Sequence, residues 1–314
     1  MYSAIVGPIH PRLRKFAILP VVAIAFALAV FWYTRRGAMS VEELLDHFPA
    51  EQGVLASVDV ASLRSGGVLG WIAGYKPVEE KEYLSFVEQS GFDYTRDLDG
   101  VLLTVRGDDV YMLLTGRFPW NKLESYVKSN GGSCEAGVCR ITGSQPSRKI
   151  SFSSIRHGVM ALAVSPNDSA VTAVLARKNQ PRTVRSQQPV WISVPPSALQ
   201  QTGSASLLPG TRPFTSALAK AETVTLSIGP REARFEAFLE VTCPTPGDAA
   251  FLQLQMQEAT ELLKSLIARE NKKPNPNDLS GVLTAGTFGR SDRQVWGKWP
   301  LERGFVRALA GGAL

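Results

Sequence analysis

The chain contains one long uninterrupted apolar segment and many short apolar segments that polar residues separate. The segment FAILPVVAIAFALAVFWY, residues 16–33, contains no charged side chain. As a helix it would span about 27 Å, which matches the hydrocarbon core of a bilayer. It ends in three aromatic residues, and two arginines follow by Arg36, as at a membrane interface. The pattern predicts an uncleaved transmembrane anchor over residues 16–36. The alternatives are a cleaved signal peptide, for which the end of the segment is poorly suited, and a buried soluble helix.

Basic residues flank this segment unequally and predict its orientation. Arg12, Arg14, Lys15 and the α-amino group precede the segment, whereas two arginines follow it. The positive-inside rule then makes residues 1–15 a short cytoplasmic tail and exports the rest of the chain. We expect a single-pass protein of the inner (cytoplasmic) membrane with a periplasmic, extracytoplasmic body.

Beyond the anchor, apolar positions alternate between the period of a strand and the period of a helix. The first half predicts a capped helix from Ser40, a strand at 53–60, helices at 61–74 and 79–90, a hairpin turning at Gly107-Asp108-Asp109, a helix from Pro119 to Asn130, strands at 138–143, 149–155 and 158–164, and a helix from Ser165 to Arg177. The second half predicts a strand at 189–194, a helix at 213–221, a hairpin turning at Gly229-Pro230, a helix at 247–270, strands at 281–289 and 294–299, and a helix at 301–310.

Each half therefore has the order β-α-β-β-α-β-β-α, which contains the ferredoxin-like, split βαβ motif. The expected fold is α+β: an N-terminal transmembrane helix followed by two tandem ferredoxin-like modules with antiparallel sheets. We place the modules at residues 40–183 and 189–314, with the polar, proline-containing stretch 177–189 as a linker. One continuous larger domain is the alternative.

The charge distribution argues against a nucleic-acid partner. The net charge is +6, but residues 1–36 alone contribute +5, and the remaining residues hold 29 basic and 28 acidic side chains. This body lacks the broad positive field that a phosphate backbone requires. Hydrophobic residues at 44% are typical of a globular body with a core, which excludes disorder over most of the length.

Short motifs after the anchor resemble a known group of proteins. Phe48-Pro49-Ala50 is followed by a strand ending in Val58-Asp59-Val60, and Leu63 comes shortly after. In this arrangement the chain resembles uncharacterised bacterial envelope proteins with a single N-terminal membrane helix. The resemblance implies an envelope location. It carries no known activity, so it assigns no catalytic residue.

Cys134 and Cys139, in GGSCEAGVCR, are a candidate disulfide. The pair follows a predicted helix and precedes a predicted strand, and no histidine lies close to it in the sequence. Metal sites need clustered ligands, and redox pairs usually have the C-x-x-C spacing at a helix start. We expect a disulfide across a turn in an exported body; two reduced thiols and a redox pair are the alternatives. The odd Cys243 is expected to be half-buried, with an intermolecular bridge as the alternative.

Two further motifs suggest chemistry but have simpler interpretations. Ser125 and Lys128 match the S-x-x-K pattern of penicillin-recognising enzymes, but the companion K-T-G strand is absent, so we expect a solvated helix face. Asp93, Asp97 and Asp99 lack the spacing of a calcium loop, so we expect a turn that enters a strand.

Gly66, Gly70 and Gly74 recur at four-residue intervals in a predicted helix. This spacing places them on one flat helix face, which allows close packing against the chain's own sheet or against a partner.

No local nucleophile–base pair or metal-ligand cluster occurs in the sequence. We therefore expect a membrane-anchored, non-catalytic binding or structural protein of the bacterial cell envelope, without a cofactor, whose exported part binds proteins or ligands. An accessory subunit of a larger membrane complex is one alternative. An envelope hydrolase whose site is assembled from distant residues is the other.

Overall fold

The computed structural model describes residues 39–48, 53–68, 81–143, 145, 147–176, 186–195, 198, 218, 220–231 and 234–310. Ser40–Leu314 form a compact unit of their own. The predicted anchor lies outside the described residues, and within those residues no helix is long and apolar enough to cross a membrane.

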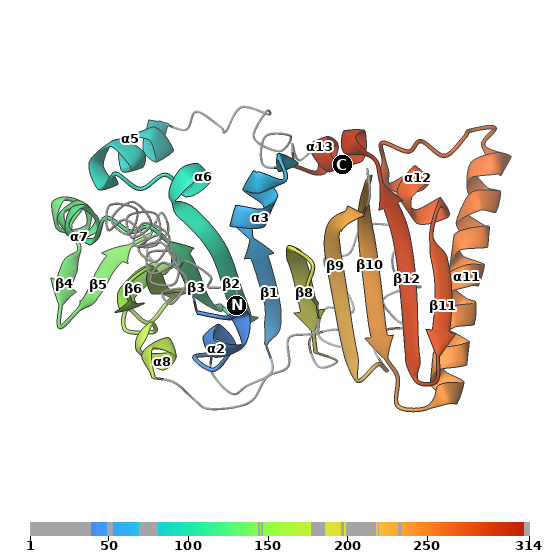
Figure 1. The fold of residues 1–314 in the computed structure, drawn as a ribbon, viewed down its shortest axis with the longest axis horizontal. Coiled ribbons are helices and arrows are strands. Elements are labelled where there is room, and N and C mark those ends of the chain that lie inside the picture. Colours follow the sequence, from blue (N-terminus) through green and yellow to red (C-terminus); the bar gives the residue numbers. More distant parts are fainter. Residues whose placement is uncertain are drawn as a thin grey trace, which may run out of the picture. The chain divides into compact units, whose positions relative to one another are not determined.

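The described strands form one antiparallel sheet of twelve, in the order β11-β12-β10-β9-β8-β1-β2-β3-β7-β6-β5-β4 (Figure 1). The strands are β1 (Val54–Asp59), β2 (Leu98–Arg106), β3 (Asp109–Gly116), β4 (Ser133–Glu135), β5 (Val138–Thr142), β6 (Lys149–Arg156), β7 (Val159–Ser165), β8 (Val190–Val194), β9 (Thr223–Arg231), β10 (Arg234–Thr242), β11 (Thr287–Ser291) and β12 (Gln294–Leu301).

Nine helices accompany the sheet in the described part of the chain. They are α2 (Val41–Leu45), α3 (Val60–Ser65), α5 (Lys81–Ser90), α6 (Tyr94–Asp97), α7 (Trp120–Ser129), α8 (Thr172–Leu175), α11 (Pro246–Arg269), α12 (Leu279–Thr284) and α13 (Arg303–Ala310). The predicted capping box is confirmed at α2, where Ser40 and Glu43 each accept the other's backbone N–H.

The prediction of two ferredoxin-like modules is wrong. β1 pairs with β8 from Leu55↔Ser193 to Val58↔Val190, so both halves contribute to one sheet. β1 also pairs directly with β2, whereas a split βαβ motif places another strand between the two. The predicted order of elements was largely right, but that order does not determine which strands pair. The module boundary expected between residues 183 and 189 stays a prediction.

The two halves nevertheless arrange their strands alike. Counted outward from the β1–β8 pair, the first half has the order β1-β2-β3-β7-β6 and the second has β8-β9-β10-β12-β11. β4 and β5 extend the first half beyond this shared order. A helix follows the third strand in each half, α7 after β3 and α11 after β10. Because β1 and β8 are antiparallel, an approximate twofold axis relates the two topologies.

Some predicted turns, strands and helices differ in the structure, because helix caps and strand pairing determine the local conformation there and the apolar pattern does not. β9 continues through Gly229 and Pro230, so the predicted turn at these residues is wrong. Residues 279–284 form α12 instead of a strand, because the Asp278 side chain accepts backbone N–H groups at the helix start. α8 is a single turn and shorter than predicted.

Separate helices pack on the two ends of the sheet. In the first half α5 and α7 cover one face, with Leu123, Val127, Cys139, Phe152 and Met160 buried beneath them. The opposite face lies near α8, where the Ser151 hydroxyl accepts the N–H of Val171. In the second half α11 packs along β11 and β12, with Leu252, Met256 and Val295 in the core (Figure 1).

Candidate functional site

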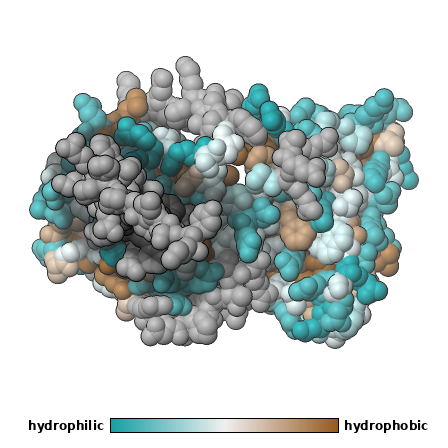
Figure 2. Space-filling model, in the orientation of Figure 1, coloured by the Kyte–Doolittle hydropathy of each residue, from teal (hydrophilic) through white to brown (hydrophobic). Residues whose placement is uncertain are grey.

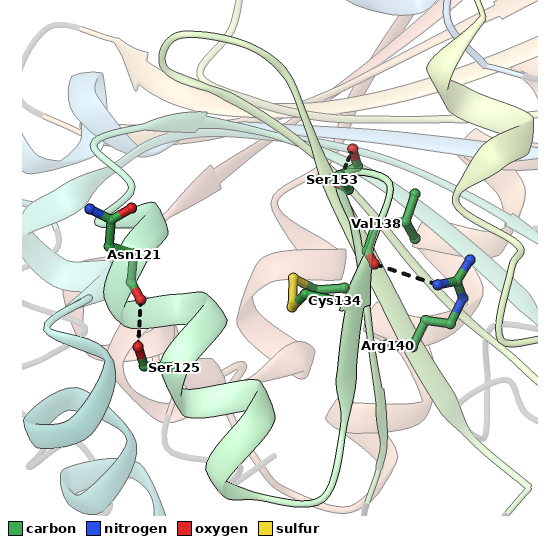
Figure 3. Close-up of a disulfide and its surroundings, with 8 residues drawn as sticks. Asn121, Ser125, Cys134, Val138, Arg140 and Ser153 are labelled. Atoms are coloured by element: carbon green, nitrogen blue, oxygen red, sulfur yellow. Dashed lines mark hydrogen bonds between the residues drawn. A yellow bond between two sulfur atoms is a disulfide. The ribbon is translucent and has the colours of Figure 1, made fainter.

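The predicted cysteine pair is joined. The sulfur atoms of Cys134 and Cys139 are 2.00 Å apart, and the two residues lie opposite each other in the β4–β5 hairpin (Figure 3). β4 is a three-residue strand at the end of the sheet. The bond therefore fastens a short edge strand to its neighbour, where a free strand edge would otherwise fray or pair with another chain.

The S-x-x-K motif lies on an exposed helix face, as expected. The Ser125 hydroxyl donates to the backbone oxygen of Asn121 at 2.8 Å, within α7 (Figure 3). This is the ordinary hydrogen bond of a serine to the preceding turn, and no described base activates the hydroxyl.

The three aspartates near α6 have different partners and do not converge. Asp93 caps α6, and Asp99 binds Arg64 at 3.2 Å. Asp97 binds Arg117 at 3.1 Å and Arg96 at 3.5 Å. Among the residues that the structure describes, no group of three histidine, cysteine or acidic side chains is placed to hold a metal.

A hydrogen-bond network around Asp93 shifts the pKa values of two side chains. Burial raises the pKa of the Asp93 carboxyl, but hydrogen bonds from Thr95 and Tyr83 outweigh burial, so that its pKa lies below the ordinary value. Burial and the neighbouring Asp93 charge together raise the pKa of Tyr83 to about 12. This network stabilises the chain turn that leads from α5 into α6.

The predicted glycine face is only partly described. Gly66 is the C-terminal cap of α3, so it follows the helix. Gly70 and Gly74 lie outside the described residues. Packing through these glycines stays a prediction.

A groove of about 330 Å³, which we call the corner groove, opens where β3 leads into α7. Its lining combines charged, aromatic and glycine residues: Gly91, Asp97, Gly116, Arg117, Phe118, Pro119, Trp120, His157 and Gly158. These residues come from the end of α5, the end of α6, the β3–α7 connection and the β6–β7 turn.

Backbone hydrogen bonds and one glycine hold the corner groove together. The N–H of Arg117 donates to the oxygen of Asp97 at 2.8 Å, and the N–H of Gly116 to the oxygen of Gly158 at 3.0 Å. A Cβ at Gly116 would lie 2.2 Å from the Asp97 oxygen, so only glycine allows this approach. The site is therefore assembled by the backbone.

Lys122 stands beside the groove wall formed by Gly91. Its ammonium nitrogen lies 3.2 Å from the position that a Cβ on Gly91 would occupy. Within the described residues no acid lies within ion-pair distance of Lys122. Arg117 is part of the groove's lining, whereas Lys122 is exposed and lies beside it.

Aromatic rings form one wall of the corner groove. Phe118 stacks on Phe92 with ring centres 5.4 Å apart, and Trp120 lies against Phe118 at 5.6 Å. Pro119 provides no side-chain cap for α7. The groove thus joins an aromatic wall to an uncapped helix start, which carries partial positive charge.

Sequence reasoning missed this groove. Its residues are spread from Gly91 to Gly158, and of these only Asp97 belongs to a set that the sequence analysis considered. The Arg-Phe-Pro-Trp run at 117–120 is a further local signal, but its proline indicates only the start of a helix.

The second half has a pocket at the equivalent corner, where β10 leads into α11. It measures about 190 Å³ and is lined by Lys220, Ala221, Cys243, Asp248, Phe251, Leu252 and Gln255. Cys243 is unpaired and buried, not half-buried as expected. Burial and the nearby charges of Asp248 and Glu222 raise the pKa of the Cys243 thiol above its ordinary value.

α11 carries apolar side chains on two opposite faces. Ala249, Leu252, Met256 and Thr260 face the core. Phe251, Leu254, Leu262 and Leu266, which we call the outer stripe, are 46–58% exposed. Figure 2 shows that hydrophobic residues form separate areas on an otherwise mostly hydrophilic surface. Four large apolar residues along one exposed helix face form an unusual cluster.

Comparison with family models and with curated proteins finds no match. Among solved structures, the chain is similar to crystal form I of a protein called TP0453, with a TM-score of 0.49 and 12% identity over 88% of this chain and 99% of that one. It is also similar to crystal form III of TP0453, with a TM-score of 0.47 and 8% identity over 87% of this chain and 99% of that one.

Proposed function

We propose that the chain is a membrane-anchored, non-catalytic binding protein of the bacterial cell envelope. The observation that carries this proposal is the corner groove, which is lined by Arg117, His157 and the aromatic residues Phe118 and Trp120. Its carboxylate, Asp97, is already engaged by Arg96 and Arg117. An acid with two cationic partners is poorly suited to proton transfer, whereas cations beside aromatic rings favour ligand binding.

The location in this proposal is supported by the Cys134–Cys139 bond. Disulfides persist in oxidising compartments and are rare in a reducing cytosol. Residues 16–36 would anchor the chain in the inner membrane, with residues 1–15 in the cytoplasm and the body exported.

The binding function is tested by purifying the whole chain in mild detergent and measuring its intact mass under native conditions. We expect a small molecule to remain on the native chain and to be lost from the Arg117→Gln variant. Lys128→Gln is the matched control, because it removes a cation from the exposed end of the same helix, away from the groove. A native chain that carries no small molecule, or retention of the molecule by Arg117→Gln, would contradict the role of the groove.

A second candidate function, accessory subunit of a larger membrane complex, is favoured by the outer stripe of α11. Exposed apolar patches of this kind mark contacts with other proteins. The same purification would then yield reproducible partner chains. We expect Leu262→Ser combined with Leu266→Ser to lose those chains, and Leu84→Ser, at an equally exposed leucine of α5, to keep them.

A further inference from the structure

The outer stripe of α11 points to a partner of one kind. We infer that it binds a second copy of this chain, with the two α11 helices antiparallel across a twofold axis between the copies. The inference is independent of the corner groove. It names an occupant for the stripe, which the second candidate function leaves to an unidentified chain.

The exposed face of α11 has nearly the same order of apolar residues from either end. With 3.6 residues per turn, Phe251, Glu258 and Leu262 lie on one side of the helix. Leu254 and Leu262 are equally far from Glu258 in the sequence, and Phe251 and Leu266 are almost equally far from it. An antiparallel copy therefore places leucine on leucine and Phe251 on Leu266, twice by symmetry.

The two ends of this face carry opposite charges. Asp248 is in the first turn of α11, and Arg269 is in its last turn. Among the described residues Arg269 has no ion-pair partner. The antiparallel arrangement brings Arg269 of each copy to the Asp248 end of the other, so the contact is complementary in charge as well as in shape.

A pocket lies at one end of the face. Asp248, Phe251 and Gln255 belong both to α11 and to the lining of the pocket of about 190 Å³ beside β10. A cavity of about this size can hold a group as large as a benzene ring. Lys220 also lines the pocket, so its charge is mixed and its shape provides most of the fit. It can receive an apolar side chain from the last turns of the other α11.

The position of α11 leaves this face accessible. The helix lies beside β11 at the end of the sheet, and none of the elements that the structure describes lies beyond it (Figure 1). The stripe residues are 46–58% exposed, so they offer on the order of 400 Å² of apolar surface per copy.

This area predicts a weak dimer. Two copies together would bury less than the roughly 1,200 Å² at which stable interfaces begin. The Glu258 carboxylates of both copies also meet near the axis, where like charges oppose each other. We expect a Kd on the order of 10–100 μM.

Disulfide cross-linking of the purified whole chain in mild detergent tests the arrangement. Glu258→Cys places a thiol near the axis, so two copies of this variant should become joined. Phe251→Cys should not join to itself, because the two positions lie about 22 Å apart along antiparallel helices, but it should join to Leu266→Cys in a mixture. The native chain is the control, since Cys134 and Cys139 are bonded and Cys243 is buried. Self-joining of Phe251→Cys as readily as Glu258→Cys, or no joining in either variant, would overturn the inference.

Sedimentation at a series of concentrations measures the strength of the dimer. Glu258→Gln removes the like charges at the axis and should tighten the Kd about threefold or more. Leu262→Ser combined with Leu266→Ser should weaken it at least about tenfold. Leu84→Ser, at an equally exposed leucine outside α11, should leave it within about twofold.

The opposite results would contradict the second copy as partner. A weaker dimer in Glu258→Gln, or an unchanged Kd in the double-serine variant, would overturn the inference. A native chain that stays monomeric while the stripe retains a different chain would also overturn it, and would keep the second candidate function. Ligand binding at the corner groove affects none of these outcomes.

Discussion

Arg117 is held to Asp97 twice, through its backbone N–H to the aspartate carbonyl oxygen at 2.8 Å and through its guanidinium to the carboxylate at 3.1 Å. The two contacts join the end of α6 to the connection between β3 and α7. Asp97 and Arg117 both line the corner groove, so this junction contributes to the shape of the site.

A double-mutant cycle of Asp97→Asn and Arg117→Gln measures the side-chain part of this junction. The Arg117 side chain is 71% exposed, so solvent screens the pair. We therefore expect a coupling energy of only about 0.5 kcal/mol in urea unfolding. A coupling above roughly 2 kcal/mol would show that the ion pair, and not the backbone, holds the corner.

Gly116→Ala should be strongly destabilising. Its Cβ would meet the Asp97 backbone oxygen at 2.2 Å, and a backbone atom has little freedom to move away. We expect the free energy of unfolding to fall by about 2 kcal/mol. Gly247→Ala, near the start of α11, is the control because its Cβ would have no contact closer than 3.6 Å; it should be neutral or slightly stabilising. Equal stability of the Gly116→Ala variant and the native chain would refute the close approach.

Replacing Cys134 and Cys139 together by serine should lower the free energy of unfolding by about 2 kcal/mol, since the bond closes a small loop in the unfolded chain. Reductant should lower the stability of the native chain to the same level. It should have no effect on the double variant. If reductant destabilised both proteins equally, its target would not be this pair.

Asp278→Ala should destabilise α12 by about 1 kcal/mol at pH 7, because it removes the cap that accepts N–H groups from Ser280 and Gly281. Hydrogen bonding from Ser280 lowers the pKa of Asp278 in the folded chain. A lowered folded-state pKa means that this stabilisation is complete above the ordinary aspartate pKa and is lost as pH falls through the folded value. Urea unfolding at a series of pH values should therefore show that the native chain and Asp278→Ala differ less in their free energy of unfolding below about pH 4.

Asp278→Asn tests the same cap without the charge. Asparagine caps nearly as well as aspartate, so the free energy of unfolding of this variant should be close to that of the native chain at pH 7. Because asparagine does not titrate, the cap should not be lost at acidic pH. A constant difference between the native chain and Asp278→Ala down to pH 2 would contradict the assigned pKa shift.

Much of the secondary structure was predictable because its signals are local. The capping box at Ser40, the strand period in β10 and the apolar spacing of α11 each gave the right element. Strand pairing was not predictable, since the contact between Val58 and Val190 joins residues far apart in the sequence, and no local pattern specifies it.

The candidate functional features also include one that the sequence predicts and one that it does not. Cys134 and Cys139 are five residues apart, so the turn between them could be inferred from spacing alone. The corner groove is lined by Gly91, Arg117 and His157, which lie far apart in the sequence. Only the fold brings these residues together, and their types are too common to stand out individually.

The central claim is that a binding body is held outside the cytoplasm by the N-terminal segment. It is tested most directly by fusing, after Leu314, a reporter enzyme that is active only once exported, to the full chain and to a chain lacking residues 1–36. We predict an active reporter on the full chain and an inactive one on the shortened chain. An inactive reporter on a well-expressed full chain would contradict the account.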